Sequence, residues 1–160
     1  MKTEKISNSR WAYSWGMGRE IEDLFKETVS KRGKEVIKSS LEDDKYKHID
    51  FWVDGVGVDV KGNRTLDKIW LEMQNTRGFD GWLKGEAEYI AFHFHDFNHF
   101  KVFRRADLLE FVEENVKGTC KTSKPYLKYY NRGKWEQKDL LVKVNYSHIK
   151  HLYHFIIKCV

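Results

Sequence analysis

Two short runs of alternating apolar and polar residues, joined by Asp54-Gly55, constrain the fold of this chain more than any other sequence feature. The runs cover residues 48–53 and 56–61, and a period of two is typical of β-strands with one buried face. An Asp-Gly pair between two such strands favours a two-residue type I′ turn, which pairs Val53 with Val56 and fixes the register. The sequence therefore predicts a β-hairpin over residues 48–61.

This register places two carboxylates directly opposite each other. Asp50 falls opposite Asp59, where the Cβ atoms of facing residues are about 4.5–5.5 Å apart and like charges repel. Aspartate is also a poor strand residue, so two of them in register need a reason. Mg²⁺ provides one, because it takes oxygen ligands, usually one or two carboxylates together with water and substrate phosphate. We therefore predict a metal site formed by Asp50 and Asp59.

A lysine completes this pattern. Lys61 follows Asp59 by two residues and so shares its face of the strand. An ammonium group there can contact a phosphate or lower the pKa of an attacking water, while a metal ion stabilises charge that develops on the phosphoryl oxygens. These three residues together predict a hydrolase.

Residues 68–75 alternate in the same way and predict a further strand. We expect its apolar face to be shared with the hairpin. The polar face would offer Glu72 as an additional carboxylate ligand and Gln74 as an amide that contacts a phosphate or a base. If this strand lies at a sheet edge, both are ordinary outward-facing polar residues.

The order of elements indicates an α/β fold with a mixed central sheet flanked by helices. At 160 residues the chain suits one domain, with a core over about 17–116 and a C-terminal β-hairpin and helix extension over about 117–160. The other expected elements are helices over 17–32, 82–90 and 107–116, strands over 35–38, 91–94, 100–103 and 140–146, a hairpin around Asn131-Arg132-Gly133 and a helix beginning at Ser147.

Asp50, Asp59-Val-Lys61 and a preceding helix with acidic residues resemble the PD-(D/E)XK nuclease superfamily, in particular its small phage-type and Holliday-junction-resolvase-like members. The resemblance implies a restriction-endonuclease-like αβββαβ core, one or two Mg²⁺ or Mn²⁺ ions and hydrolysis of DNA. Asp50 would match the first aspartate, Asp59 the acidic position and Lys61 the lysine. Many members add a glutamate from the first helix, for which Glu22 is preferred and Glu20 is the reserve.

The resemblance covers about residues 17–112. It includes the stretches 70–75 and 81–92, where small phage-type members have a helix that leads into the next core strand. Lys84 lies on this expected helix and would be an auxiliary residue near the site. A homodimer is a further hypothesis, because cutting a duplex or resolving a junction favours two active sites.

The charge balance favours a polyanionic partner. Lysine and arginine number 29 against 24 acidic residues, a net charge of +5. The C-terminal region interleaves basic and aromatic residues, which suits contacts with phosphates and bases. A solvated hairpin with aromatics packed on the core is the alternative. The expected nucleic-acid-binding residues are Lys121, Lys124, Lys128, Arg132 and Lys134.

Two sets of histidines are weighed against the carboxylate site. His93, His95 and His99 suggest zinc only weakly, because alternation with phenylalanine already explains a half-buried strand. His148, His151 and His154 step by three, as on the wet face of a helix. Neither set is expected to be catalytic.

The expected compartment is the cytoplasm, or the host cell cytoplasm if the chain is phage-encoded. The N-terminal residues lack an apolar signal segment and no run approaches the roughly 18 apolar residues that span a bilayer. Cys120 and Cys159 lack C-x-x-C spacing, which fits a reducing compartment without a cysteine zinc site.

Two other functions stay open at this level. A non-catalytic DNA-binding module of the same fold would keep the basic surface, and a metal-dependent ribonuclease would keep the whole site. The presence of every ligand together with Lys61 favours an enzyme, and DNA is the expected substrate with RNA as the alternative polymer.

Overall fold

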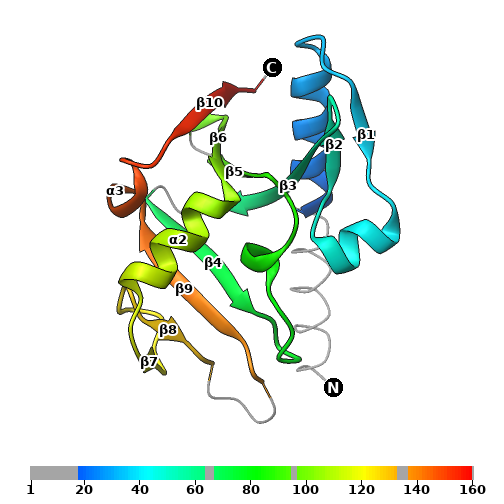
Figure 1. Cartoon of the computed structure of the whole chain (residues 1–160). Coiled ribbons are helices and arrows are strands. Elements are labelled where there is room, and N and C mark those ends of the chain that lie inside the picture. The colour runs from blue at the N-terminus through cyan, green and yellow to red at the C-terminus, as the bar shows by residue number, and fades with distance from the viewer. Residues whose placement is uncertain (1–17, 64–66, 95–96, 133–136, 160) are drawn as a thin grey trace, which may run out of the picture.

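The structure is a computed structural model, and it describes residues 18–63, 67–94, 97–132 and 137–159. It is a mixed α/β fold built on two β-sheets, one of six strands and one of four, with helices packed against them (Figure 1). The α/β class with a mixed sheet is therefore confirmed. No helix in the described part of the chain is long and apolar enough to cross a membrane.

The six-stranded sheet has the order β1-β2-β3-β5-β6-β10. Neighbouring strands are antiparallel except β3 and β5, which run parallel, and this makes the sheet mixed. Its strands are β1 Val36–Lys38, β2 Phe51–Val53, β3 Val56–Asn63, β5 Tyr89–Phe94, β6 His99–Arg104 and β10 His154–Lys158.

The hairpin of β2 and β3 has the predicted register. Val53 pairs with Val56 and Phe51 with Val58. Asp54 and Gly55 form the turn with φ values of 48° and 82°, the left-handed conformation that a type I′ turn requires at both positions. The Asp-Gly prediction is confirmed.

The strand over residues 68–74 lies in a different sheet from the one predicted. β4 is paired with β9, with Trp70 opposite Lys143, and so does not continue the apolar face of the hairpin. This pairing joins segments about seventy residues apart, which local alternation does not reveal. The four-stranded sheet has the order β4-β9-β8-β7, with β4 Lys68–Gln74, β9 Leu140–Asn145, β8 Tyr129–Tyr130 and β7 Thr119–Cys120.

Both faces of the six-stranded sheet are covered. Residues 18–30 are helical, as predicted, and pack Phe25 and Val29 against Phe51 and Val58. The other face meets the four-stranded sheet and α2 (Arg105–Asn115), which together bury a larger core around Phe92. Figure 1 shows the first helix and α2 on opposite sides of this sheet.

The helix predicted over 82–90 is wrong. Only Trp82–Lys84 form a short 3₁₀ turn, η2, and the chain is already in β5 at Tyr89. β5 lies between β3 and β6 with both of its faces covered, and such burial overrides a helix-like pattern. At Gly85 a Cβ atom would lie 2.8 Å from the carbonyl oxygen of Lys47, so the close approach of these two backbones requires glycine.

The C-terminal region also departs from its predicted form. The expected helix is the short α3 (Tyr146–Ile149), and β10 follows it where no strand was predicted. β8 and β9 are antiparallel, while Gly133 of the predicted hairpin lies outside the described residues. The region after residue 117 thus adds strands to both sheets.

Candidate active site

The two aspartates of the hairpin lie together, as their register predicts. The backbone N–H of Asp50 donates to the carbonyl of Val58 at 2.9 Å, which continues the ladder by one residue. The Asp50 carboxylate accepts a hydrogen bond from the N–H of Val60 at 2.7 Å, which holds it over β3. Asp50 is 6% exposed and Asp59 is 1% exposed. The sheet therefore buries both carboxyl groups side by side.

Asp59 is the most perturbed group of this cluster. Burial raises the pKa of Asp59 well above its ordinary value, Lys61 acts against this rise, and Asp50 adds to it. Asp59 Oδ1 forms an ion pair with Lys61 Nζ at 2.8 Å. Its Oδ2 is buried and receives no hydrogen bond from an N–H or hydroxyl donor, and the Asp50 carboxyl group lies within hydrogen-bonding reach of the Asp59 carboxyl group. Two buried carboxyl groups this close share a proton or bind a cation, so the pair is a natural ligand position.

Lys61 stays a cation in this setting. Burial alone would lower the pKa of Lys61, but Asp59 and Asp50 outweigh burial and the pKa is raised. The side chain of Lys61 is still 30% exposed, and its Nζ lies 5.3 Å from the centre of the Trp82 ring. The ammonium group is therefore held between a carboxylate and an aromatic face, on a side chain that is partly exposed.

A third carboxylate approaches the pair and was missed by the sequence analysis. Asp44 lies on η1 (Asp43–Lys47), a π-helical turn. Partial removal from water raises the pKa of Asp44, and the neighbouring Asp50 raises it further. The acidic pair before the hairpin was the available signal. The left-handed residue His48 (φ 55°), which turns η1 back onto the hairpin, could not be foreseen.

The glutamates of the first helix lie further out. Glu22 forms an ion pair with Lys38 Nζ at 2.5 Å. Lys38 is close enough to Asp44 to lower the pKa of that carboxyl group, against its net rise. Glu22 thus reaches the cluster through Lys38, and Glu20 is exposed to solvent.

The residues predicted from β4 and the following segment separate into two groups. Glu72 is close enough to Lys61 to help raise the pKa of Lys61, though less than the aspartates do. Gln74 Nε2 donates to the carbonyl of Lys138 at 2.6 Å, and Lys84 pairs with Asp80 at 3.6 Å on the surface. Glu72 therefore lies at the site, whereas Gln74 and Lys84 are engaged elsewhere.

The donors at this cluster fit a hard divalent cation. They are carboxylate oxygens, and the fold brings the carboxyl groups of Asp50 and Asp59 against each other. Within the described ranges no three His, Cys, Asp or Glu side chains converge to bind a metal by themselves. An ion bound by Asp50 and Asp59 would therefore complete its shell with water and substrate oxygens, which is the usual arrangement for Mg²⁺.

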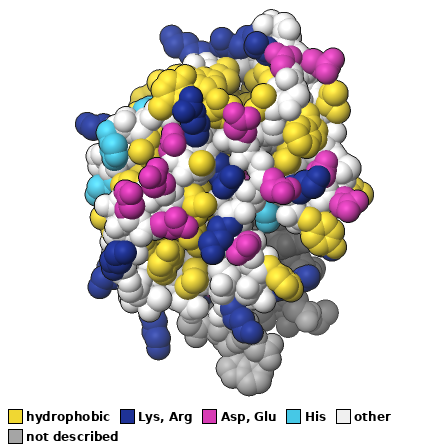
Figure 2. All heavy atoms as spheres, in the orientation of Figure 1, with side chains coloured by type: hydrophobic (Ala, Val, Ile, Leu, Met, Phe, Trp, Pro, Cys, Tyr) yellow, Lys and Arg dark blue, Asp and Glu magenta, His cyan; other side chains and the backbone are white. Residues whose placement is uncertain are grey.

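The basic residues of the C-terminal region differ in their surroundings. Arg132 Nε forms an ion pair at 2.8 Å with Asp139, which is 1% exposed, so this arginine stabilises a buried carboxylate. Lys134 lies outside the described residues. Figure 2 shows acidic and basic side chains interspersed on the visible face, without a field of one sign. The exposed lysines of the predicted set are Lys121, Lys124 and Lys128.

The histidines mostly serve packing. His93 is 5% exposed and contacts the Phe100 ring at 5.0 Å, and His95 lies outside the described residues. His154 is on β10 and not on a helix, and it stacks on Phe103 at 4.6 Å. The wet helical face predicted for His154 is therefore wrong.

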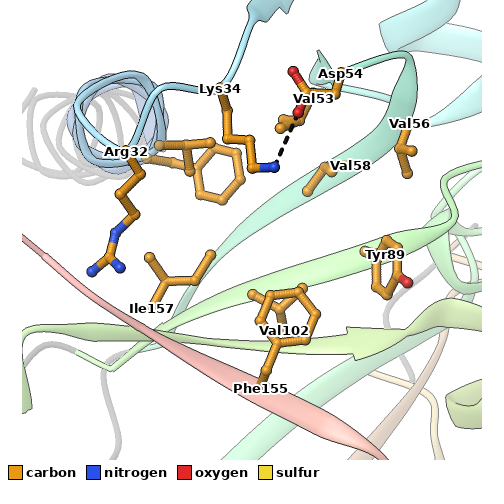
Figure 3. Close-up of a pocket in the computed structure, with 12 residues that line it drawn as sticks. Arg32, Lys34, Val53, Asp54, Val56, Val58, Tyr89, Val102, Phe155 and Ile157 are labelled. Atoms are coloured by element: carbon orange, nitrogen blue, oxygen red, sulfur yellow. Dashed lines mark ion pairs between the residues drawn. The ribbon is translucent and has the colours of Figure 1, made fainter.

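An apolar cavity of about 360 Å³ lies on the opposite face of the six-stranded sheet (Figure 3). Phe25, Val58 and Val102 are among its lining residues. Lys34 and Asp54 form an ion pair of 3.2 Å at its rim, and this pair adds no net charge to the cavity. Val58 and Asp59 are successive strand residues and point to opposite faces, so the carboxylate cluster and this cavity are separate.

A comparison of the chain with protein-family models, with curated proteins and with solved structures finds no match.

Proposed function

We propose that the chain is a Mg²⁺- or Mn²⁺-dependent deoxyribonuclease of the restriction-endonuclease-like type, with Asp50, Asp59 and Lys61 at its centre. The observation that carries this proposal is the pair itself: Asp59, a 1%-exposed carboxyl group, lies against Asp50 and forms an ion pair with Lys61. A divalent cation between the two carboxylates would offset both their lost hydration and their mutual repulsion.

The order of elements supports the proposed αβββαβ core. A helix precedes three antiparallel strands, β1, β2 and β3, and β5 then runs parallel to β3. In place of a full helix before β5, the chain has β4 and the short η2 turn. Asp50 directly precedes β2 and Asp59 lies on β3, in the order that the superfamily resemblance implies.

The chemistry follows from the protonation states. Because Lys61 keeps its proton, it acts as a donor that holds the scissile phosphate or orients the attacking water, and not as a general base. Asp50, fixed by the Val60 N–H, and Asp59 would hold the ion. The ion, when bound, would supply a water of lowered pKa and stabilise charge on the phosphoryl oxygens. Direct attack by water would invert the configuration at phosphorus.

A non-catalytic DNA-binding module of this fold is less well supported. Such a module has no use for two facing buried carboxyl groups, whose desolvation and mutual repulsion cost folding energy. A metal-dependent ribonuclease would use the same residues, so it is separated from a deoxyribonuclease by its substrate alone.

The test is cleavage of end-labelled linear, circular, single-stranded and branched DNA, and of RNA, in Mg²⁺, Mn²⁺ or EDTA. We expect metal-dependent cutting of DNA that is lost in Asp50→Asn and in Lys61→Ala. Cleavage of RNA alone would identify the ribonuclease. The absence of cleavage of any polymer, with DNA binding intact in both variants, would favour the binding module.

A further inference from the structure

The outer face of the four-stranded sheet carries an aromatic cluster. On β4, Ile69 and Leu71 are buried, so Trp70 and Glu72 point outward. On β9 the buried Val142 likewise leaves its neighbours facing outward. Trp70 is 37% exposed, which is a large aromatic area for a surface position.

The register brings a lysine into this cluster. Lys143 on β9 is opposite Trp70 on β4. Its Nζ lies 5.4 Å from the centre of the Trp70 ring and 5.8 Å from that of Tyr126. Tyr130 on β8 contacts Trp70 at a ring separation of 5.9 Å. We define the stacking face as Trp70, Tyr126, Tyr130 and Lys143.

This face adjoins the carboxylate cluster. Glu72 follows Trp70 by two residues on the same face, about 6.6 Å along the strand. At Gly81 a Cβ atom would lie 2.6 Å from Glu72 Cγ, so η2 passes directly against Glu72. The next residue, Trp82, lies over Lys61. The outer face of β4 therefore leads from Trp70 to Lys61 through Glu72 and η2.

We infer that the stacking face binds a single-stranded segment of nucleic acid and guides it to the Asp50–Asp59 site. Aromatic rings with an interleaved cation are the usual means of holding unpaired bases and their phosphates, whatever the sequence. A duplex does not offer the faces of its inner bases to such rings. Three exposed lysines, Lys121, Lys124 and Lys128, lie on the segment that carries β7 into β8 and add phosphate-attracting charge.

This inference rests on the proposed nuclease function and narrows its substrate to DNA with unpaired strands, such as single strands, flaps or branches. If the stacking face instead bound a protein partner, substitutions in it would leave the binding of both single-stranded and duplex DNA unchanged. The two readings are separated by the experiment below.

The test is fluorescence anisotropy of a labelled single-stranded oligothymidylate of about twelve nucleotides and of a duplex of equal length, measured in EDTA with the Asp59→Asn chain. EDTA and this substitution prevent cleavage, so binding is read alone. Trp70→Ala and Lys143→Met are the test variants. Tyr153→Ala is the matched control, because Tyr153 is 58% exposed and lies under a cation, Arg104, at 4.9 Å on another surface.

We expect Trp70→Ala to weaken single-strand binding by about fivefold or more, as for the loss of one stacked base, with duplex binding changed by less than about twofold. Lys143→Met, which keeps the apolar stem, should weaken single-strand binding and reduce its salt dependence. Tyr153→Ala should match the parent. If Trp70→Ala fails to fold by circular dichroism, Lys143→Met carries the test.

Single-strand binding within about twofold of the parent in the folded test variants would overturn the inference, as would equal weakening of single strand and duplex. Failure of the nuclease proposal would give a different result. The wild-type chain would then show no Mg²⁺-dependent cleavage, while Trp70-dependent binding of single strands would persist. The two failures are therefore distinguishable.

Discussion

The carboxylate of Asp50 accepts a hydrogen bond from the backbone N–H of Val60 at 2.7 Å, so the residue just before β2 is fixed over the strand that carries Asp59. This bond and the hairpin register act together. The register sets which residues face each other, and the hydrogen bond sets where the Asp50 oxygens lie. The repulsion between two buried carboxylates is thereby built into the fold, and a bound cation would relieve it.

Lys61→Met tests the role of the ammonium group. Methionine keeps the unbranched stem beside Trp82 but removes the donor. We expect cleavage to fall by about 10²–10³-fold, the usual loss when one preorganised donor to the reacting group is removed. Because the metal ligands remain, Mn²⁺ binding measured by calorimetry should persist. An unchanged cleavage rate would remove Lys61 from the mechanism.

Asp44→Asn tests the third carboxylate. Asp44 contacts Asp50 and increases the negative charge around it. We expect the variant to bind Mn²⁺ about tenfold more weakly, as when a residue that supports a ligand is changed. Asp43→Asn is the control, because Asp43 pairs with Lys47 at 2.9 Å. Equal effects of both substitutions on calorimetric affinity would mean that the whole turn, and not Asp44, is responsible.

Mg²⁺ should raise the melting temperature of the chain. An ion that binds only the folded state stabilises it by about 2.7 kcal/mol at a hundred times its dissociation constant, which is several degrees for a domain of this size. Asp50→Asn should melt higher than wild type in EDTA, since it removes one of two facing charges, and should lose the Mg²⁺ shift. Differential scanning calorimetry measures both, and an Mg²⁺ shift that survives in Asp50→Asn would place the ion elsewhere.

Lys101 gives a pH-dependent prediction away from the site. It is 8% exposed, its Nζ lies 4.6 Å from the Tyr146 ring and 4.9 Å from the Phe94 ring, and burial lowers the pKa of Lys101 below its ordinary value of 10.5. In the folded state Lys101 therefore loses its proton at a lower pH than it does in the unfolded state. The free-energy cost of burying the charged Lys101 is therefore full at neutral pH and disappears as the pH rises through the folded pKa toward 10.5.

Lys101→Met is accordingly expected to raise the free energy of unfolding at neutral pH by about 1 kcal/mol, after allowance for the lost cation–π contacts. This gain should shrink as the pH approaches 10.5. Urea denaturation of both chains at several pH values checks the prediction. A gain that grows with pH would contradict the assigned direction of the shift.

The parts of the site that are local in sequence were predictable. Alternation and the Asp-Gly turn fix the register, and the register places Asp50 beside Asp59. β4 joined a different sheet because its partner, β9, follows it by about seventy residues, and no local pattern encodes such a pairing. Asp44 reaches Asp50 only through the left-handed turn at His48, and although histidine is enriched among non-glycine residues at positive φ, it adopts that conformation too seldom for the sequence to predict it.

The helix-like spacing of residues 82–90 gave a wrong prediction because long-range strand pairing, as for β4, decides the structure of this segment. These residues include the start of β5, whose central position between β3 and β6 decides its structure more than its own sequence does. The consequence for the site is direct, because the short η2 turn, and not a helix, brings Trp82 over Lys61.

Mg²⁺-dependent cleavage of one labelled DNA, compared between the Asp59→Asn and Asp54→Asn variants, tests whether Asp59 is the centre of the active site. Both substitutions replace a hairpin aspartate by its amide, but Asp59 is buried at the cluster whereas Asp54 is exposed at the turn. We predict that Asp59→Asn abolishes cleavage while Asp54→Asn retains the wild-type rate. Cleavage by Asp59→Asn at the wild-type rate, or metal-independent cleavage in EDTA, would contradict a metal-dependent active site centred on Asp59.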